Sequence, residues 1–251
     1  MTNYTVLTER RGNVLLITLN RPDAMNAIDT DLTHGLLAAL AELESDPEIA
    51  VGVLTGTGRG FCAGMDLKAF AESGPPPGFD RLVQDSPSKP LIAAIEGFAL
   101  AGGLELALIC DLIVSARGAK FGIPETSVGL FAARGGLFRL PRRVPYGVAM
   151  EMALTAQPIT AEQAHEYGLV TRLADPGEAV ATALALAERI AANAPLAVAV
   201  SKRLIRELAA LSEQDAWKAQ EPDEDQIFAS DDALEGSLAF AEKRPPSWSG
   251  K

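Results

Sequence analysis

Histidine and cysteine are scarce in this sequence, with two of each among 251 residues. Cys62 and Cys110 are too few for a disulfide framework and lack a CxxC spacing, so reduced thiols are expected. His34 and His165 lie far apart without a nearby pattern of ligands, and we interpret them as surface or cap residues rather than catalytic groups. No metal site is expected.

Blocks of basic residues are also missing. The chain has 22 Lys and Arg against 33 Asp and Glu, a formal net charge of −11 at pH 7. This excess of negative charge disfavours electrostatic capture of nucleic acid or of an anionic membrane. Any anionic ligand must therefore be held by a local arrangement of donors.

Uninterrupted hydrophobic runs of membrane-spanning length are absent as well. The apolar stretch at 91–110 is broken by Glu96, Glu105 and several glycines, which predicts a buried core segment rather than a membrane span. The N-terminal residues show no apolar run after their basic residues, so no secretory signal is expected. A cytoplasmic protein is the resulting prediction.

Hydrophobic residues make up 48% of the chain, enough for one large core. Helical periodicity at 30–46 predicts an amphipathic helix, and the proline-rich segment 73–80 predicts a mobile loop. The first part of the chain thus alternates strands with helices. Strands are predicted from β-branched, apolar runs at 14–20, 50–56, 91–97 and 111–116.

After about residue 141 the pattern becomes helical. Thr160 and Gln163 have the spacing of a capping box. Apolar stripes on so many helices need cover from the body or from a sister subunit, so we expect oligomerisation. We divide the chain into a core with the catalytic site, residues 1–195, and a helical region for oligomerisation and ligand cover, residues 196–251. Longer helices are predicted at 178–193, 196–210, 213–220 and 230–243.

One carboxylate stands out in the stretch GFALAGGLELALICDL, residues 97–112. Glu105 is its only ionisable side chain before the final aspartate, just behind Gly102 and Gly103. A buried carboxylate is either matched by partners or kept for chemistry. The glycine pair favours two interpretations: close backbone packing, or a helix start whose free N–H groups bind an oxyanion.

Two further segments favour the chemical interpretation. GRGFCAGMDLK, residues 58–68, is a glycine-rich turn that exposes the N–H groups of Gly64 and Met65. Two such turns can aim two donors at a thioester or ester carbonyl as it becomes an enolate, each contributing roughly 3 kcal/mol. FGIPETSVGL places a second glutamate, Glu125, where a strand and a turn can return it opposite Glu105.

Taken together, these motifs resemble the enoyl-CoA hydratase/isomerase family, also called the crotonase family. The match also includes LNRPDAMNAI at 19–28 and AFAEKRPPSW at 239–248, so it spans nearly the whole chain. The resemblance implies an α/β fold, a crotonase-like spiral of ββα units followed by a C-terminal helical trimerisation region. It further implies a homotrimer that pairs into a hexamer, acyl-CoA thioester substrates and no separate cofactor, since coenzyme A is part of the substrate.

The same resemblance implies an enoyl-CoA hydratase, a lyase of fatty acid β-oxidation that adds water syn to a 2-enoyl-CoA and gives a 3-hydroxyacyl-CoA. By motif position the backbone N–H groups of Met65 and Gly102 form the oxyanion hole. Glu105 acts mainly as base toward water, and Glu125 delivers a proton to the α-carbon. Their titrations are expected to be coupled.

Coenzyme A is implied to lie across the turn at 24–27 and along the backbone of 63–68. Lys68 is a candidate phosphate partner. Lys243 matches a C-terminal lysine that reaches the nucleotide, in some relatives from a neighbouring subunit. For both lysines a solvated surface charge is the alternative. The implied binding residues are Ala24, Ala63, Asp66, Leu67, Lys68, Phe240 and Lys243.

The chain departs from the family pattern at GLFAARGG, residues 129–136, which brings Phe131 and Arg134 near the acyl pocket. Arg134 has three possible roles: it faces solvent, pairs with an acid, or meets a polar or carboxylated acyl chain. The stretch is also similar to the carnitinyl-CoA dehydratase branch. Glu96 is interpreted as a packing or hydrogen-bonding residue at a strand end.

Alternative functions remain. A Δ3,Δ2-enoyl-CoA isomerase needs only one carboxylate, whereas two glutamates favour hydration. Thioesterase or dehalogenase chemistry calls for an aspartate nucleophile, which ETSVGL lacks. From another class, a non-catalytic CoA-thioester-binding scaffold predicts binding without turnover, and an RNA-associated relative is disfavoured by the negative charge.

Overall fold

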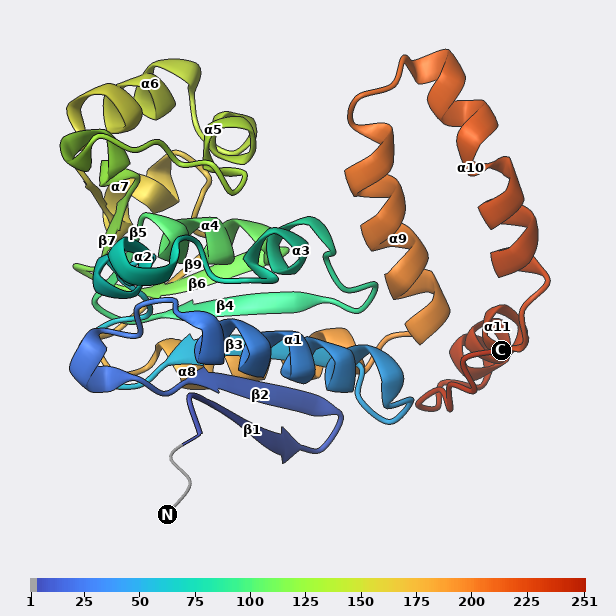
Figure 1. Cartoon of the computed structure of the whole chain (residues 1–251). Helices are drawn as coiled ribbons and strands as arrows, with labels where there is room; N and C mark the ends of the chain where they lie inside the picture. Colours follow the sequence, from blue (N-terminus) through green and yellow to red (C-terminus); the bar gives the residue numbers. More distant parts are fainter. Residues whose placement is uncertain (1–3) are drawn as a thin grey trace.

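A six-stranded sheet forms the centre of the molecule in this computed structural model, which describes residues 4–251 (Figure 1). In sheet order its strands are β1 (Val6–Arg11), β2 (Val14–Leu19), β3 (Val51–Gly56), β4 (Leu91–Ile95), β6 (Leu112–Ala116) and β9 (Arg172–Ala174). β1 and β2 pair antiparallel, and the other neighbours pair in parallel. The four strands predicted from apolar runs are confirmed as β2, β3, β4 and β6.

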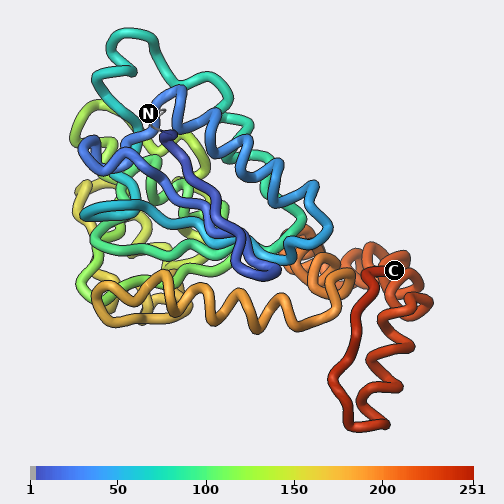
Figure 2. The backbone as a smooth tube through the Cα atoms, turned by 90° about the horizontal axis from the view of Figure 1, so that it is seen from below, coloured from blue at the N-terminus to red at the C-terminus, as the bar shows by residue number. Residues whose placement is uncertain are grey.

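Both faces of this sheet are covered, which explains why its inner strands are apolar without alternation. Leu15 points into the larger core together with the apolar stripe of α1 (Thr30–Ser45), the helix predicted at 30–46. Leu16, one residue later, points into a second core closed by α8 (Ala179–Ala191). Figure 2 shows α1 and α8 on opposite sides of the strands.

A smaller sheet consists of β5 (Phe98–Leu100), β7 (Lys120–Gly122) and β8 (Ile159–Thr160). The chain leaves β4, enters β5 after a two-residue turn, and then begins α4 (Gly102–Ile109). The chain passes from the large sheet to the small sheet a second time between β6 and β7. Each repeat thus gives one strand to each sheet, and the expected spiral of ββα units is confirmed.

Short helices occupy the connections. The loop predicted at 73–80 is shorter than expected: its proline-containing part, Gly74 to Gly78, is non-helical, but Ser73 belongs to α2 and α3 begins at Phe79. The capping box at the start of α7 is confirmed, with reciprocal bonds of 2.9 and 3.2 Å between Thr160 and Gln163. These helices are η1 (Pro22–Ala24), α2 (Leu67–Ser73), α3 (Phe79–Gln84), η2 (Pro124–Val128), α5 (Gly136–Arg139), η3 (Leu140–Arg142), α6 (Tyr146–Thr155) and α7 (Ala161–Glu166).

The last three helices extend from the α/β body (Figures 1 and 2), and the first of them contacts that body through an ion pair of 2.8 Å between Lys202 and Asp111. They are α9 (Pro195–Leu208), α10 (Glu213–Phe228) and α11 (Asp231–Glu242), and the division expected at residue 195 falls in the first turn of α9. Large apolar side chains remain exposed on them: Ile205, Trp217, Phe228, Leu234 and Phe240.

The helix predicted at 213–220 is longer than expected, because α10 continues through Pro222 to Phe228. An ion pair between Asp223 and Arg203 of α9 lies directly after the proline. This contact between two helices stabilises the second half of α10, and local sequence signals do not reveal it.

Within residues 4–251 no single helix has both the length and the apolar character needed to cross a membrane. α8 and α9 meet the criterion only when taken together, and they are bent by 110° relative to each other.

Candidate active site

Glu105 lies in the first turn of α4, and all eight residues of this helix are buried. The helix starts close against a neighbouring turn, since a Cβ on Gly103 would lie 2.3 Å from the Cys62 carbonyl oxygen. Close packing therefore explains Gly103. Gly102 opens the helix, and its N–H has no intrahelical acceptor.

The turn that carries Met65 lies beside this helix start. Bridges pair Met65 with Ile28 and Cys62 with Ala99 of β5, so the turn runs alongside the start of α4. A Cβ on Gly102 would lie 3.5 Å from the Met65 nitrogen. In the described part of the chain, the N–H groups of Met65 and Gly102 have no hydrogen-bond acceptor. Two unused donors thus lie side by side.

Glu105 is held by backbone donors from a distant loop. Its Oε1 accepts hydrogen bonds from the Arg134 N–H at 2.6 Å and the Gly136 N–H at 2.9 Å, and the residue is only 2% exposed. Burial raises the pKa of Glu105, while the two N–H groups and the positive charges of Arg134 and Arg139 oppose that rise. These backbone donors are not predicted by any motif in the sequence, where the glycine pair at 135–136 is their only signal.

Glu125 is presented by η2, immediately after β7. Its Oε2 atom is buried and accepts no hydrogen bond from residues 4–251. Burial, with a further contribution from the charge of Glu105, raises the pKa of Glu125 to about 7. Glu125 can therefore carry a proton near neutral pH, whereas Glu105 has donors that stabilise its ionised form.

Because the pKa of Glu125 is raised in the folded protein, the stability of the protein should depend on pH. The folded state holds this proton up to about pH 7, but an unfolded chain releases it near pH 4.5, so the group's contribution to stability is lost as pH rises through that window. Glu125→Gln cannot ionise. We expect the variant to gain stability relative to wild type as pH rises: its free energy of unfolding minus that of wild type should be larger at pH 8 than at pH 5.5 by on the order of 2 kcal/mol. Denaturant unfolding at both pH values measures this; an equal difference at both would contradict it.

Both glutamates and both donor residues line one cavity of about 220 Å³. The remainder of the wall is mainly apolar. The structure thus brings together a carboxylate that accepts hydrogen bonds, a protonatable carboxyl group and two free N–H donors. The other lining residues are Ala63, Leu67, Phe79, Ala101, Pro124, Ser127, Val128, Leu130, Phe131, Ala133 and Arg134.

Several residues expected to bind coenzyme A lie near this cavity. Ala24 ends η1, and Ala63 donates a hydrogen bond of 3.1 Å to the Met25 carbonyl of the same turn. Asp66 caps α2 and pairs with Arg21 at 3.2 Å, so its side chain is engaged in structure. Leu67 lines the cavity, and Lys68 is exposed on the first turn of α2.

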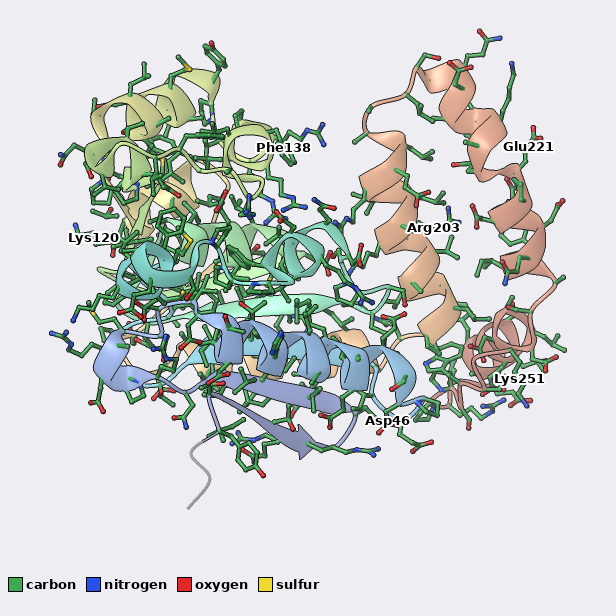
Figure 3. The ribbon with its side chains drawn as sticks, viewed as in Figure 1. Asp46, Lys120, Phe138, Arg203, Glu221 and Lys251 are labelled. Atoms are coloured by element: carbon green, nitrogen blue, oxygen red, sulfur yellow. The ribbon has the colours of Figure 1, made fainter. Side chains whose placement is uncertain are left out.

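Phe240 and Lys243 are not brought to the cavity within one chain. They lie on α11 and at its C-terminal cap, where Phe240 is 88% exposed. Figure 1 shows α11 at the right, below α9 and α10, whereas β5 and β7, which lead into α4 and η2, lie at the left of the body. In Figure 3, Lys120 of β7 and Arg203 of α9 likewise lie on opposite sides. A role for Phe240 and Lys243 therefore requires a second subunit and stays a prediction.

Glu96 and Arg134 have definite partners. The Glu96 carboxylate accepts hydrogen bonds from the N–H groups of Gly177 and Ala179 at 3.1 Å each, at the start of α8, which confirms the hydrogen-bonding role. The Nε atom of Arg134 lies 2.9 Å from Asp80 Oδ1, so this arginine pairs with an acid, the second of its three expected roles. It also lines the cavity.

Comparisons with known sequences and structures found similar proteins. The sequence model of the enoyl-CoA hydratase/isomerase family matches residues 9–251. Enoyl-CoA hydratase EchA19 of Mycobacterium tuberculosis is 42% identical over 256 residues, covering 98% of this chain and 96% of that protein. A carnitinyl-CoA dehydratase of Proteus mirabilis is 41% identical over 253 residues, covering 96% and 97%. The crystal structure of an enoyl-CoA hydratase from M. tuberculosis H37Rv superposes with a TM-score of 0.94 at 50% identity, over 99% of this chain and 100% of the other.

Proposed function

The chain belongs to the enoyl-CoA hydratase/isomerase family, and on that premise we propose that it is an enoyl-CoA hydratase, a lyase that adds water syn across the double bond of a 2-enoyl-CoA thioester. The observation that supports this most is the presence of Glu105 and Glu125 on the wall of one cavity with two free N–H donors. Hydration needs a base and an acid on one face of a conjugated thioester, together with stabilisation of its enolate.

In the proposed reaction, Glu105 accepts a proton from water as the water oxygen bonds to the β-carbon. The thioester oxygen gains negative charge, which the N–H groups of Met65 and Gly102 stabilise. Protonated Glu125 then delivers its proton to the α-carbon, giving the 3-hydroxyacyl thioester. The proton held by Glu105 returns to Glu125 before the next turnover, so no net proton is consumed. The unpaired, buried Oε2 of Glu125 supports its role as the acid.

Coenzyme A binding is part of the proposal. The turn around Ala24 and the backbone of Ala63, Asp66, Leu67 and Lys68 would hold the nucleotide and pantetheine, with Phe240 and Lys243 supplied by a neighbouring subunit. The apolar residues exposed on α9, α10 and α11 support a homotrimer, in which such surfaces are covered. Pairing of trimers and a cytoplasmic, β-oxidation role are proposed on the same family basis.

Coenzyme A enters only as part of the substrate, and the chemistry proposed needs no metal. Within residues 4–251 no group of three or more His, Cys, Asp or Glu side chains is arranged to hold a metal ion.

Two related activities use the same cavity. An isomerase moves a proton between carbons of a 3-enoyl thioester, for which one carboxylate suffices, so the second glutamate favours hydration. A dehydratase runs the water addition in reverse, and relatives 38–41% identical are named carnitinyl-CoA dehydratases. A scaffold that binds CoA thioesters without turnover leaves the protonatable Glu125 unexplained.

The test is turnover of crotonyl-CoA, followed as loss of absorbance of the conjugated enoyl thioester, with incorporation of ¹⁸O from labelled water into the product. Because Glu125 must be protonated, we expect kcat/KM for hydration to fall as pH rises above about 7. Conversion of a 3-enoyl-CoA without ¹⁸O uptake would favour the isomerase. Tight thioester binding with no conversion of any enoyl-CoA would favour the scaffold.

A further inference from the structure

Arg134 adds a positively charged residue to the wall of the cavity that Glu105 and Glu125 line, and its backbone is held in place by hydrogen bonds. Its backbone N–H donates to Glu105 Oε1 at 2.6 Å, so the residue is tied to one of the proposed catalytic carboxylates. Its side chain is 24% exposed, and the residue is part of the cavity wall. Arg139 Nη1 donates to the Arg134 carbonyl oxygen at 3.4 Å, which places a second guanidinium behind the same loop.

The ion pair with Asp80 leaves much of the Arg134 guanidinium unused. Nε is 2.9 Å from Asp80 Oδ1, yet it is buried and its N–H is not aligned for a hydrogen bond. The two Nη groups donate no hydrogen bond to residues 4–251. Asp80 lies in the first turn of α3, its side chain is 65% exposed, and it does not line the cavity. The counter-charge thus lies on the solvent side, and a planar pair of donors stays available.

A hydrocarbon acyl chain does not use these donors. It would fill the apolar part of the wall, near Phe79, Leu130 and Phe131, but would itself offer the Arg134 donors no acceptor. A carboxylate matches two parallel guanidinium N–H groups and displaces a partner that is free to rotate into solvent. At about 220 Å³ the cavity is smaller than the ~300–1,000 Å³ of most small-molecule sites, which favours a short chain.

We propose that the acyl group of the substrate carries a carboxylate at its distal end, bound by the Arg134 guanidinium in place of Asp80. The substrate class is then the mono-CoA thioester of a short 2-unsaturated dicarboxylic acid. This inference rests on the proposed hydratase function and specifies its acyl group. Negative charge near Glu105 is balanced by Arg134 and Arg139, which both lie close enough to lower the pKa of that carboxylate.

The experiment compares three 2-enoyl-CoA thioesters that differ at the distal end: crotonyl-CoA with a methyl group, glutaconyl-CoA with a carboxylate, and 4-trimethylammonio-crotonyl-CoA with a cation. For wild type we expect kcat/KM to be at least tenfold higher for the carboxylate than for the methyl group, and lowest for the cation. Arg134→Gln should lower the ratio of carboxylate to methyl at least tenfold, mainly through KM. Arg134→Lys should give an intermediate ratio, because it keeps the charge and loses the fork.

Asp80→Asn provides a test with the opposite sign. This variant removes the carboxylate that competes with the substrate for Arg134. The ratio of kcat/KM for glutaconyl-CoA to kcat/KM for crotonyl-CoA should therefore rise severalfold, with crotonyl-CoA turnover unchanged. A structural clamp between Arg134 and Asp80 predicts instead that both variants lower the melting temperature and slow all three substrates alike, which would overturn the proposal.

Two further outcomes separate this inference from the hydratase proposal. Hydration of crotonyl-CoA with no preference for the carboxylate would overturn the inference and leave the hydratase intact. A preference for the cation that Asp80→Asn abolishes would also overturn it and would assign the distal subsite to Asp80. Absence of turnover with all three thioesters would overturn both.

Discussion

Glu125→Gln is expected to lower kcat for hydration of crotonyl-CoA by a factor of about 10² to 10⁴, the usual contribution of a positioned acid or base. Glutamine has nearly the same shape but holds no transferable proton. Glu105→Gln should have an effect of the same order, because an amide oxygen can still accept hydrogen bonds from Arg134 and Gly136 yet cannot take a proton from water. Initial rates across a range of substrate concentrations give kcat and KM for each variant.

Two comparisons make this result decisive. The double variant should be little slower than either single variant, because groups that act in one step are not additive. Glu96→Gln is the matched control: its carboxylate also accepts backbone hydrogen bonds, at the start of α8, and it does not line the cavity. We expect its kcat to equal that of wild type. Near-normal kcat in either catalytic-site variant would contradict the assignment of the two glutamates.

Gly64→Ala is expected to reduce kcat by about 10² to 10³, the cost of losing one oxyanion-hole donor. Gly64 has a φ of +99°, and a Cβ there would lie 2.6 Å from the Ala101 Cβ and 3.0 Å from the Gly102 nitrogen. The added methyl group must push the turn away from the start of α4. The N–H groups of Met65 and Gly102, which we propose as the oxyanion hole, are then displaced from each other.

A change at a second glycine separates this effect from backbone strain. Gly118, in the turn between β6 and β7, has a φ of +77°, and nothing lies within 4 Å of a Cβ built there. Gly118→Ala should therefore lower stability by about 1–2 kcal/mol and leave kcat unchanged. Both variants are assayed below their melting temperatures. Equal activities for the two would show that the Gly64 turn does not form the oxyanion hole.

Prediction from the sequence succeeded where neighbouring residues carry the signal. The apolar runs of β2, β3, β4 and β6, the stripe of α1 and the capping box at Thr160 each depend on a few adjacent positions. The predicted length of α10 was wrong because its second half does not depend on neighbouring residues alone. Its continuation through Pro222 is stabilised by Arg203, a residue on another helix.

The candidate site divides in the same way. Glu105, Glu125 and the two glycine-rich turns were recognisable from residue types and spacing. The N–H groups of Arg134 and Gly136, which hold Glu105, come from a loop whose backbone direction has no local signature. The partner of Arg134 was equally hidden, because Asp80 lies 54 positions earlier in the chain.

The sequence by itself determined four strands of the central sheet, the amphipathic helix α1, the family and the chemical groups available for catalysis, since these follow from local periodicity and from residues grouped in short motifs. Only the tertiary structure decided that both glutamates and two free N–H donors line one cavity, that Asp80 pairs with Arg134, and that Phe240 and Lys243 lie far from the cavity in the same chain. The physical reason is that burial, electrostatic coupling and hydrogen-bond geometry depend on distances between segments that are remote in sequence.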